Sequence, residues 1–335
     1  MSTRLFRLGS RATPRPRLDM IALSDPVEPR RNLVARARQT SVLMMNRGIR
    51  TSIVGVGAWG KNVARELSAV SDLAGYVSAR PDRLGWLPRL SIDEILSDPT
   101  IKAVAVVTPI ALLSQFARLA LNAEKHVFVE KPLARTAAEA QVLAEAAQMR
   151  HLILATGYQF VYHPVYTELK RRLDRESVRR VTLEWRKFGT FVDTIEHVLL
   201  THHLAIALDL LGEPLSGTIR RNAAIKTACD KVETTLLYRN CEVRSLIDRH
   251  ANERSHIIQV ELLNGSSFIW DGNHLLLRRA TGGVVETLYE AQGTSLAVEL
   301  SSFIGAISGN RMLLSTAGNF GARVLSIYEM LAAIK

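Results

Sequence analysis

The sequence contains very little cysteine. Its two cysteines, Cys229 and Cys241, form no CxxC pair, and no His/Cys cluster has the spacing of metal ligands. The sequence therefore predicts neither a disulfide framework nor a metal site. We expect two buried, reduced thiols in a cytoplasmic protein.

Long apolar runs are also missing. The longest stretch without Asp, Glu, Lys or Arg is His151–Thr167, which is too short to span a bilayer. With 335 residues, 47% hydrophobic and 22% charged, the composition is that of a globular protein with about two domains. We expect no membrane partner.

Acidic residues are scarce in the first 50 positions, which hold eleven arginines, no lysine and three acids. The other 285 residues carry 32 basic and 29 acidic groups, so the net charge of +11 comes mainly from this arm. Apart from Phe6, no aromatic residue interleaves with the arginines, which gives little support for stacking on nucleic-acid bases. No nucleic-acid partner is predicted.

The arm, residues 1–48, has three interpretations. Its Arg-rich, acid-poor composition resembles an organellar transit peptide. Its four prolines and its lack of an apolar face favour disorder. The third interpretation is that Met44 or Met45, which directly precedes the first predicted strand, is the true start. We expect the arm to be disordered or mis-assigned.

Two patterns follow each other along the rest of the chain. Over residues 49–156, apolar strands alternate with amphipathic helices, which predicts an α/β Rossmann domain with a doubly wound parallel sheet. After Gly157, half-buried strands with turns at 264–265 and 271–272 predict hairpins. Residues 157–335 are therefore predicted to form an α+β substrate and oligomerisation domain with a mainly antiparallel, open-faced sheet.

A glycine-rich loop lies between the first predicted strand and the first predicted helix. In such loops glycine permits a tight turn and lets the backbone approach a pyrophosphate at the helix N-terminus. The predicted cofactor-binding residues are Gly55, Gly57, Ala58, Trp59 and Gly60.

The end of the second predicted strand carries the residues that select the ribose. No Asp or Glu stands there to pair with a 2′-hydroxyl, whereas Ser78 and Arg80 suit a 2′-phosphate. The sequence therefore favours NADP over NAD as the cofactor.

Four segments, the glycine loop among them, occur in order along the chain. They are the glycine loop, Val106-Val-Thr-Pro109, Lys125-His-Val-Phe-Val-Glu-Lys-Pro132 and Gly157-Tyr-Gln-Phe-Val-Tyr-His-Pro164. Together they resemble the glucose-fructose oxidoreductase / inositol dehydrogenase / rhizopine-catabolism (Gfo/Idh/MocA) family of NAD(P)-dependent oxidoreductases, over about residues 50–335.

The resemblance implies hydride transfer at a sugar or cyclitol carbon between a Rossmann domain and an open-faced sheet domain. It makes Lys131 and His202 the proton-handling residues, since a desolvated Lys or a His titrates near neutrality. Thr108, Pro109, Glu130 and Lys131 would complete the cofactor site, and Tyr162 and His163 are the expected substrate contacts.

Three positions depart from the family pattern. Val198 stands where an Asp often orients the catalytic His, with Glu196 or His197 as neighbouring substitutes, and Leu113 replaces a frequent His. Val161 replaces an Arg, and the resulting Val-Tyr-His-Pro resembles nucleotide-sugar members of the family.

We therefore expect an NAD(P)-dependent dehydrogenase or reductase of a nucleotide-linked or otherwise modified sugar. The departures keep a non-catalytic dinucleotide-binding sensor or partner protein as an alternative, and an imine reductase as another. An exposed face of the second sheet predicts a homodimer or homotetramer.

Overall fold

The computed structural model describes residues 48–80, 83–186, 194–222, 229–283, 285–309 and 314–333. The predicted arm lies outside these residues, apart from Gly48. Contacts divide the chain into Met1–Ser41 and Val42–Lys335, and every described residue belongs to the second unit. None of the described helices is long and apolar enough to cross a membrane.

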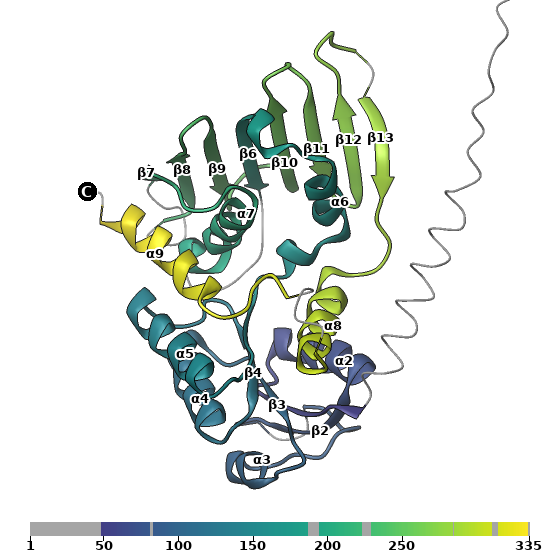
Figure 1. The fold of residues 1–335 in the computed structure, drawn as a ribbon, viewed down its shortest axis with the longest axis vertical. Helices are drawn as coiled ribbons and strands as arrows, with labels where there is room; N and C mark the ends of the chain where they lie inside the picture. Colours follow the sequence, from purple (N-terminus) through teal and green to yellow (C-terminus); the bar gives the residue numbers. More distant parts are fainter. Residues whose placement is uncertain are drawn as a thin grey trace, which may run out of the picture. The chain divides into compact units, whose positions relative to one another are not determined.

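The first sheet consists of five parallel strands in the order β2-β1-β3-β4-β5 (Figure 1). Its strands alternate with helices along the chain, which confirms the predicted Rossmann architecture. The elements are β1 (Arg50–Val54), α2 (Ala58–Val70), β2 (Asp72–Val77), α3 (Ile92–Ser97), β3 (Ala103–Val106), α4 (Ile110–Asn122), β4 (His126–Glu130), α5 (Ala137–Met149) and β5 (Leu154–Gly157).

The second sheet has eight strands in the order β13-β12-β11-β10-β6-β9-β8-β7, and only the β6–β9 pair is parallel. The predicted mainly antiparallel sheet is thus confirmed. Its strands are β6 (Val178–Arg186), β7 (Ser216–Asn222), β8 (Lys231–Leu237), β9 (Glu242–Asp248), β10 (Ser255–Leu262), β11 (Ser267–Asp271), β12 (His274–Arg278) and β13 (Val285–Glu290).

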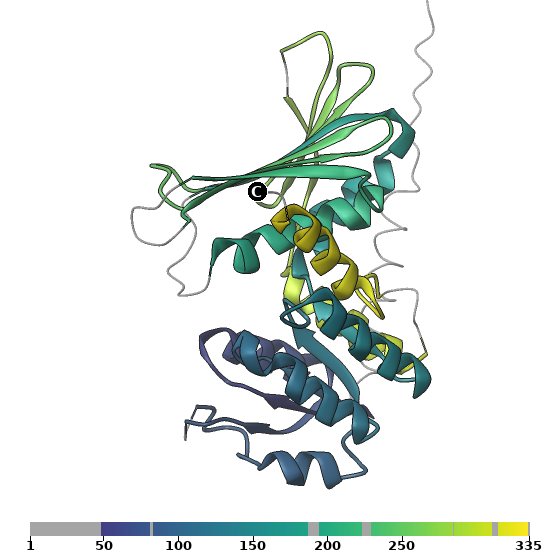
Figure 2. The ribbon, with the colours of Figure 1, turned by 90° about the vertical axis from the view of Figure 1, so that its left-hand side faces the viewer.

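Helices lie along one face of this second sheet (Figure 2). Inward side chains such as Val181, Leu183 and Trp185 are buried, whereas their neighbours along β6 are at least partly exposed. The remaining elements are η2 (Gln159–Tyr162), α6 (Pro164–Arg172), η3 (Arg175–Ser177), η4 (Glu196–Leu200), α7 (Thr201–Leu211), α8 (Ser295–Ile307) and α9 (Phe320–Ala332).

The two C-terminal helices return to the first sheet. Helix α8 packs against α2, and α9 packs against both α5 and α7 (Figure 1). The Glu329 carboxylate on α9 also accepts a hydrogen bond from the Ala137 N–H at the start of α5, at 2.7 Å. Helix α9 therefore ties the helix that carries His202 to the parallel sheet.

Candidate active site

A cavity of about 1130 Å³ lies at the carboxyl ends of the parallel strands. The loops after β1 and β3, the ends of β2 and β4, and the segment from η4 to the start of α7 line it. Ligands of open α/β sheets bind at this edge. The predicted residues that the structure brings together here are Gly55, Gly57, Ala58, Trp59, Gly60, Ser78, Arg80, Thr108, Pro109, Glu130, Lys131 and His202.

The glycine loop is shaped by close backbone contacts. Gly55 has φ +98°, and a Cβ there would lie 2.2 Å from the Val107 carbonyl oxygen. A Cβ at Gly60 would lie 2.2 Å from the Gly55 carbonyl oxygen. By contrast, a Cβ at Gly57 would meet no atom within 4 Å, so this position opens onto the cavity.

The N-terminus of α2 is suited to bind an anion. Gly57 is its N-cap, no side chain caps the helix, and the first turn contains no acidic residue. The first-turn N–H groups therefore have no side-chain acceptor, and the helix dipole adds a partial positive charge. Together with the glycine cradle, this end of the cavity fits the pyrophosphate of a dinucleotide.

The end of β2 contributes polar and basic groups to the cavity. Ser78, Arg80 and Arg83 all line it, and the Arg80 N–H donates to the Ser78 Oγ at 3.2 Å. Glu130 is the only carboxylate among the described lining residues, and it lies on β4 rather than β2.

Glu130 links the glycine loop to the end of β4. Its Oε1 accepts a hydrogen bond from the Trp59 indole Nε1 at 2.6 Å, and its Oε2 accepts one from the Lys131 N–H at 3.3 Å. Burial raises the pKa of the Glu130 carboxyl, while Trp59 and Lys131 act in the opposite direction.

Lys131 and His202 reach the cavity from different elements, since Lys131 directly follows β4 and His202 lies in the first turn of α7. The Lys131 Nζ donates to the Val198 carbonyl oxygen at 2.7 Å, so the residue that replaces the expected Asp holds the lysine through its backbone. His202 is 5% exposed, and its Nδ1 has no hydrogen-bond partner within the described part of the chain.

Glu196 and His197, the two suggested substitutes for the missing Asp, have other partners among the described residues. The Glu196 carboxylate accepts hydrogen bonds from Arg221 and from the Tyr328 hydroxyl. The His197 Nδ1 lies 2.9 Å from the Thr194 Oγ1, and the ring contacts Tyr328. With valine in place of the expected Asp at position 198, the Nδ1 of His202 is left without a hydrogen-bond partner among the described residues.

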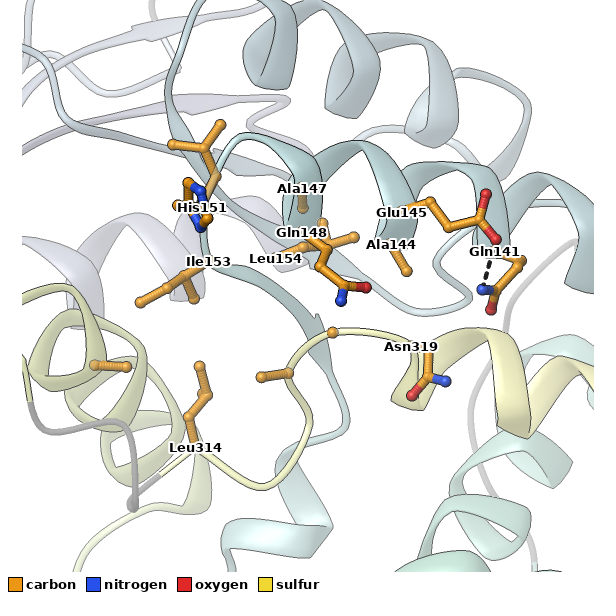
Figure 3. A pocket seen from close by; sticks show the side chains of 14 residues that line it. Gln141, Ala144, Glu145, Ala147, Gln148, His151, Ile153, Leu154, Leu314 and Asn319 are labelled. Atoms are coloured by element: carbon orange, nitrogen blue, oxygen red, sulfur yellow. Dashed lines mark hydrogen bonds between the residues drawn. The ribbon is translucent and has the colours of Figure 1, made fainter.

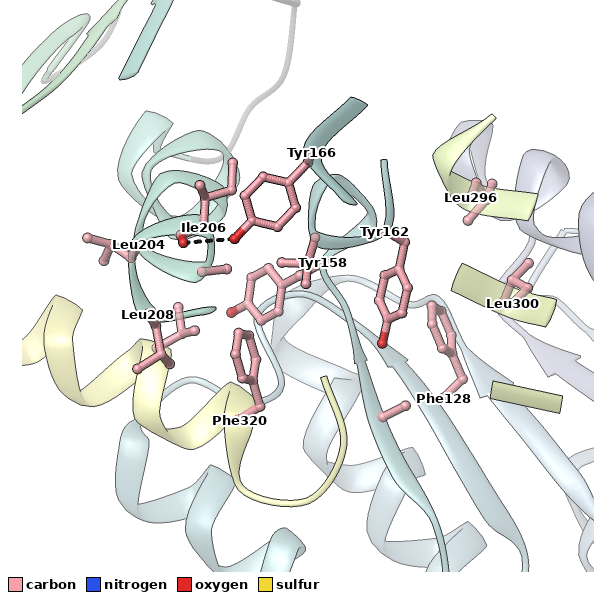
Figure 4. Close-up of a cluster of buried hydrophobic side chains, with 14 of the residues drawn as sticks. Phe128, Tyr158, Tyr162, Tyr166, Leu204, Ile206, Leu208, Leu296, Leu300 and Phe320 are labelled. Atoms are coloured by element: carbon pink, nitrogen blue, oxygen red, sulfur yellow. Dashed lines mark hydrogen bonds between the residues drawn. The ribbon is translucent and has the colours of Figure 1, made fainter. Parts of the chain in front are cut away.

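Tyr162 and His163 do not line the cavity. Residues 159–162 form the short helix η2. The Tyr162 ring lies among buried side chains such as Phe128 (Figure 4), and its hydroxyl lies 3.0 Å from the Thr316 Oγ1. The His163 Nδ1 accepts from the Val165 N–H at the start of α6, and its ring packs on Trp270. Gln159 is the residue of this segment that reaches the cavity.

Several lining residues escaped the sequence analysis. Leu112 and Phe116 on α4 and Leu199 in η4 are apolar residues that belong to no recognisable sequence motif. Arg83 lies three positions after Arg80, so proximity to a predicted residue was the available signal.

A second cavity, of about 470 Å³ (Figure 3), shares no lining residue with the first. It is bordered by α5, by the residues leading into β5 and by residues 314 and 317–319. Because it meets the amino end of β5, it is not at the edge where a dinucleotide would bind. None of the predicted site residues lines it.

Four histidines lie together at and behind the wall of the cavity, His202 and His203 buried and His163 and His256 half-buried; we call them the histidine cluster. Trp185 contacts the rings of His202, His203 and His256. Burial lowers the pKa of all four imidazoles, to about 4 for His163 and for His256.

The histidine cluster predicts an acid-sensitive fold. In the unfolded chain these histidines titrate at about pH 6.5, so below that pH the unfolded state binds more protons than the folded state. The stability that they confer is complete above about pH 6.5 and is lost as the pH falls towards about 4. The raised pKa values of Glu130 and Glu299 act in the opposite direction, but four histidines outnumber two carboxyls.

We therefore expect the free energy of unfolding in urea to be markedly lower at about pH 5 than at about pH 7.5. His256→Gln removes one of the titrating groups and is expected to reduce this difference, whereas the exposed His274→Gln is not. Equal stability of the native chain at both pH values would contradict the prediction.

The comparisons with known proteins agree with this geometry. Residues 49–158 match the GFO_IDH_MocA model, described as an oxidoreductase family with an NAD-binding Rossmann fold. The scyllo-inositol 2-dehydrogenase (NAD(+)) of Bacillus subtilis is 31% identical over 288 residues, which cover 74% of this chain and 82% of that protein. The chain belongs to the Gfo/Idh/MocA oxidoreductase family.

Another member is similar over more of its length. The UDP-N-acetylglucosamine 3-dehydrogenase of Acidithiobacillus ferrooxidans is 27% identical over 303 residues, covering 83% of this chain and 94% of that protein. A solved structure of this relative superposes with a TM-score of 0.78 at 26% identity, over 85% of this chain and 97% of that one. Both sheets therefore belong to the family fold.

Proposed function

We propose that this protein is an NAD(P)-dependent dehydrogenase or reductase that transfers hydride to or from a CH–OH carbon of a nucleotide-linked sugar. One observation carries the proposal. A single cavity joins the uncapped N-terminus of α2, which suits a pyrophosphate, to Lys131 and His202, which suit proton transfer.

The chain's own residues have distinct parts in this proposal. Gly55, Gly57 and Gly60 hold the pyrophosphate, and the bound dinucleotide supplies the hydride acceptor or donor. Lys131, held by the Val198 carbonyl, takes the proton of the substrate hydroxyl or returns it to a carbonyl oxygen. His202 offers a second hydrogen-bonding group to the same oxygen.

The proposed substrate class rests on relatives and on sequence. One relative is named for UDP-N-acetylglucosamine. A dTDP-3,4-didehydro-2,6-dideoxy-alpha-D-glucose 3-reductase of Streptomyces violaceoruber is 37% identical over 86 residues, a quarter of each chain. The Val-Tyr-His-Pro segment points the same way. A homo-oligomer and a cytoplasmic location stay predictions from the sequence.

We also propose NADP as the preferred cofactor, because Ser78 and Arg80 line the cavity at the end of β2 and none of the described lining residues beside them is a carboxylate. Ser78→Asp places a negative charge where a 2′-phosphate would bind. We expect it to weaken NADPH binding by roughly ten- to hundredfold, the effect of losing a charge-assisted hydrogen bond, and to weaken NADH binding much less. An unchanged NADPH:NADH ratio of Kd values would contradict the assignment.

Fluorescence titration with NADPH and NADH tests the proposed function. Trp59 lines the cavity, whereas Trp86, another tryptophan of the Rossmann half, is 57% exposed and does not. We expect dinucleotide-dependent quenching that Trp59→Phe reduces and Trp86→Phe preserves. Incubation with oxidised dinucleotide and UDP-N-acetylglucosamine, followed at the absorbance of the reduced nicotinamide, then tests the substrate class. Binding without turnover of any nucleotide sugar would favour the non-catalytic alternative.

A further inference from the structure

A second glutamate is buried behind the cavity. Glu299, on α8, is 1% exposed, and neither of its carboxyl oxygens has a hydrogen-bond partner among the residues that the structure describes. Leaving an ionised carboxylate without partners in the interior is costly. The surroundings of Glu299 therefore decide which protonation state it holds.

Contacts along α8 place Glu299 opposite Glu130. One turn further along α8, the Phe303 ring contacts the Phe128 ring, with the ring centroids 5.8 Å apart. Phe128 and Glu130 are two residues apart on β4, so they share one face of the sheet. One turn before Glu299, the Ser295 hydroxyl donates to Gln159, which lines the cavity beside Glu130.

The charge of Glu130 acts on the Glu299 carboxyl. Burial raises the pKa of Glu299 well above its usual range, and the charge of Glu130 raises it further, while the Tyr158 backbone acts in the opposite direction. The hydroxyls of Tyr158 and Tyr162 are two further titratable groups nearby. Burial raises the pKa values of both, the charge of Glu130 raises that of Tyr158 further, and the charge of Glu299 raises that of Tyr162 further.

The hydrogen bonds distinguish the two carboxyls. Glu130 accepts from the Trp59 indole and from the Lys131 N–H, and the Lys131 cation lies beside it. Glu299 has no side-chain donor within the described residues, and the nearby backbone N–H of Tyr158 already donates to the Thr156 carbonyl oxygen. Where two carboxyls interact in a buried site, the one with donors ionises and the other retains its proton.

We propose that Glu299 is a positioning residue that holds the single proton shared by the two carboxyls, so that Glu130 stays ionised and keeps Trp59 bound at the end of β4. Trp59 belongs to the first turn of α2, so its hydrogen bond to Glu130 fixes the position of the phosphate-binding end of the cavity relative to Lys131. The negative charge of Glu130 also favours a cationic ligand ring, which means the oxidised nicotinamide. This last consequence rests on the proposed function.

Infrared difference spectroscopy of the full chain without cofactor tests the position of the proton. At neutral pH, a buried protonated carboxyl gives a carbonyl band that ionised carboxylates lack. We expect Glu299→Gln to abolish this band, Glu130→Gln to leave it, and the exposed Glu145→Gln to have no effect. A band that disappears with Glu130→Gln instead, or no band in the native chain, would overturn the proposal.

Equilibrium titration with NADP+ and with NADPH tests the consequence for ligands. Glu130→Gln is expected to raise the Kd for NADP+ about tenfold relative to that for NADPH, because a neutral amide no longer attracts the oxidised ring. An unchanged ratio would overturn the charge assignment of Glu130. Failure to bind either dinucleotide would count against the proposed function, while the infrared result would still decide where the proton lies.

Discussion

Replacing Lys131 with methionine is expected to lower the rate of hydride transfer by about 10²–10⁴-fold, the usual contribution of a general acid or base. Methionine keeps the length and the apolar stem of lysine but has no proton to exchange. It also loses the 2.7 Å hydrogen bond to the Val198 carbonyl. The dinucleotide Kd should change little, because the phosphate end of the cavity is formed by α2 and the glycine loop.

A matched variant separates the charge of Lys131 from its proton. Arginine keeps a cation and a donor at this position, but its guanidinium stays protonated at every working pH. We therefore expect Lys131→Arg to bind dinucleotide as the native chain does and to remain slow. Single-turnover rates with a nucleotide sugar measure both variants. Native rates in Lys131→Met would remove this residue from the mechanism and return the proton transfer to His202.

The architecture was predictable because local patterns specify it. The Ser91 and Glu94 capping box opens α3 with both reciprocal hydrogen bonds, and Thr136 caps α5. The turns at 264–265 and 271–272 join β10, β11 and β12 into a meander. In each case the residues that determine the structure are neighbours in sequence, so the local sequence pattern is sufficient to predict the cap or the turn.

The cavity was predictable for a related reason. The carboxyl ends of parallel strands meet at one edge, so residues that follow β1, β2, β3 and β4 must converge there. Gly55, Ser78, Thr108 and Glu130 do line one cavity. His202 comes from a distant element, and only its resemblance to a family residue brought it into the set.

What the sequence could not predict depends on orientation and tertiary contact. Tyr162 was expected to contact the substrate. Its segment forms the helix η2, in which the Tyr162 hydroxyl lies beside Thr316 instead of lining the cavity. The helix that carries His202 is preceded by a π-helix over Glu196–Leu200. The residues Asp193-Thr-Ile-Glu196 have the pattern of a helix-capping box, but Asp193 lies outside the described residues.

Glu299 is the clearest example of a residue whose proposed role the sequence alone could not predict. It lies in an apolar helix with no motif around it, and nothing in the sequence relates it to Glu130. Its importance arises only when α8 packs beside β4 and both carboxyls become buried. Whether a polar side chain is buried without hydrogen-bond partners depends on tertiary packing, so the local sequence pattern does not predict it.

Gly55→Ala is expected to cost about 3 kcal/mol of stability or more, and dinucleotide binding with it. At φ +98° an L-residue is strained, by about 1–3 kcal/mol. The added Cβ would also lie 2.2 Å from the Val107 carbonyl oxygen, so the loops after β1 and β3 must separate. Urea unfolding measures the loss of stability, and fluorescence titration with NADPH measures the loss of binding.

Gly57→Ala provides the control within the same loop. A Cβ there meets no atom within 4 Å, and its φ of −74° suits any L-residue, so the free energy of unfolding should stay within about 0.5 kcal/mol of the native value. The methyl group nevertheless enters the space before the first turn of α2, where a pyrophosphate would bind, so NADPH affinity should fall. If Gly57→Ala bound NADPH as tightly as the native chain, the backbone at Gly57 would not be in contact with the phosphates. The fold would then retain its glycine cradle at Gly55 and Gly60 for packing alone.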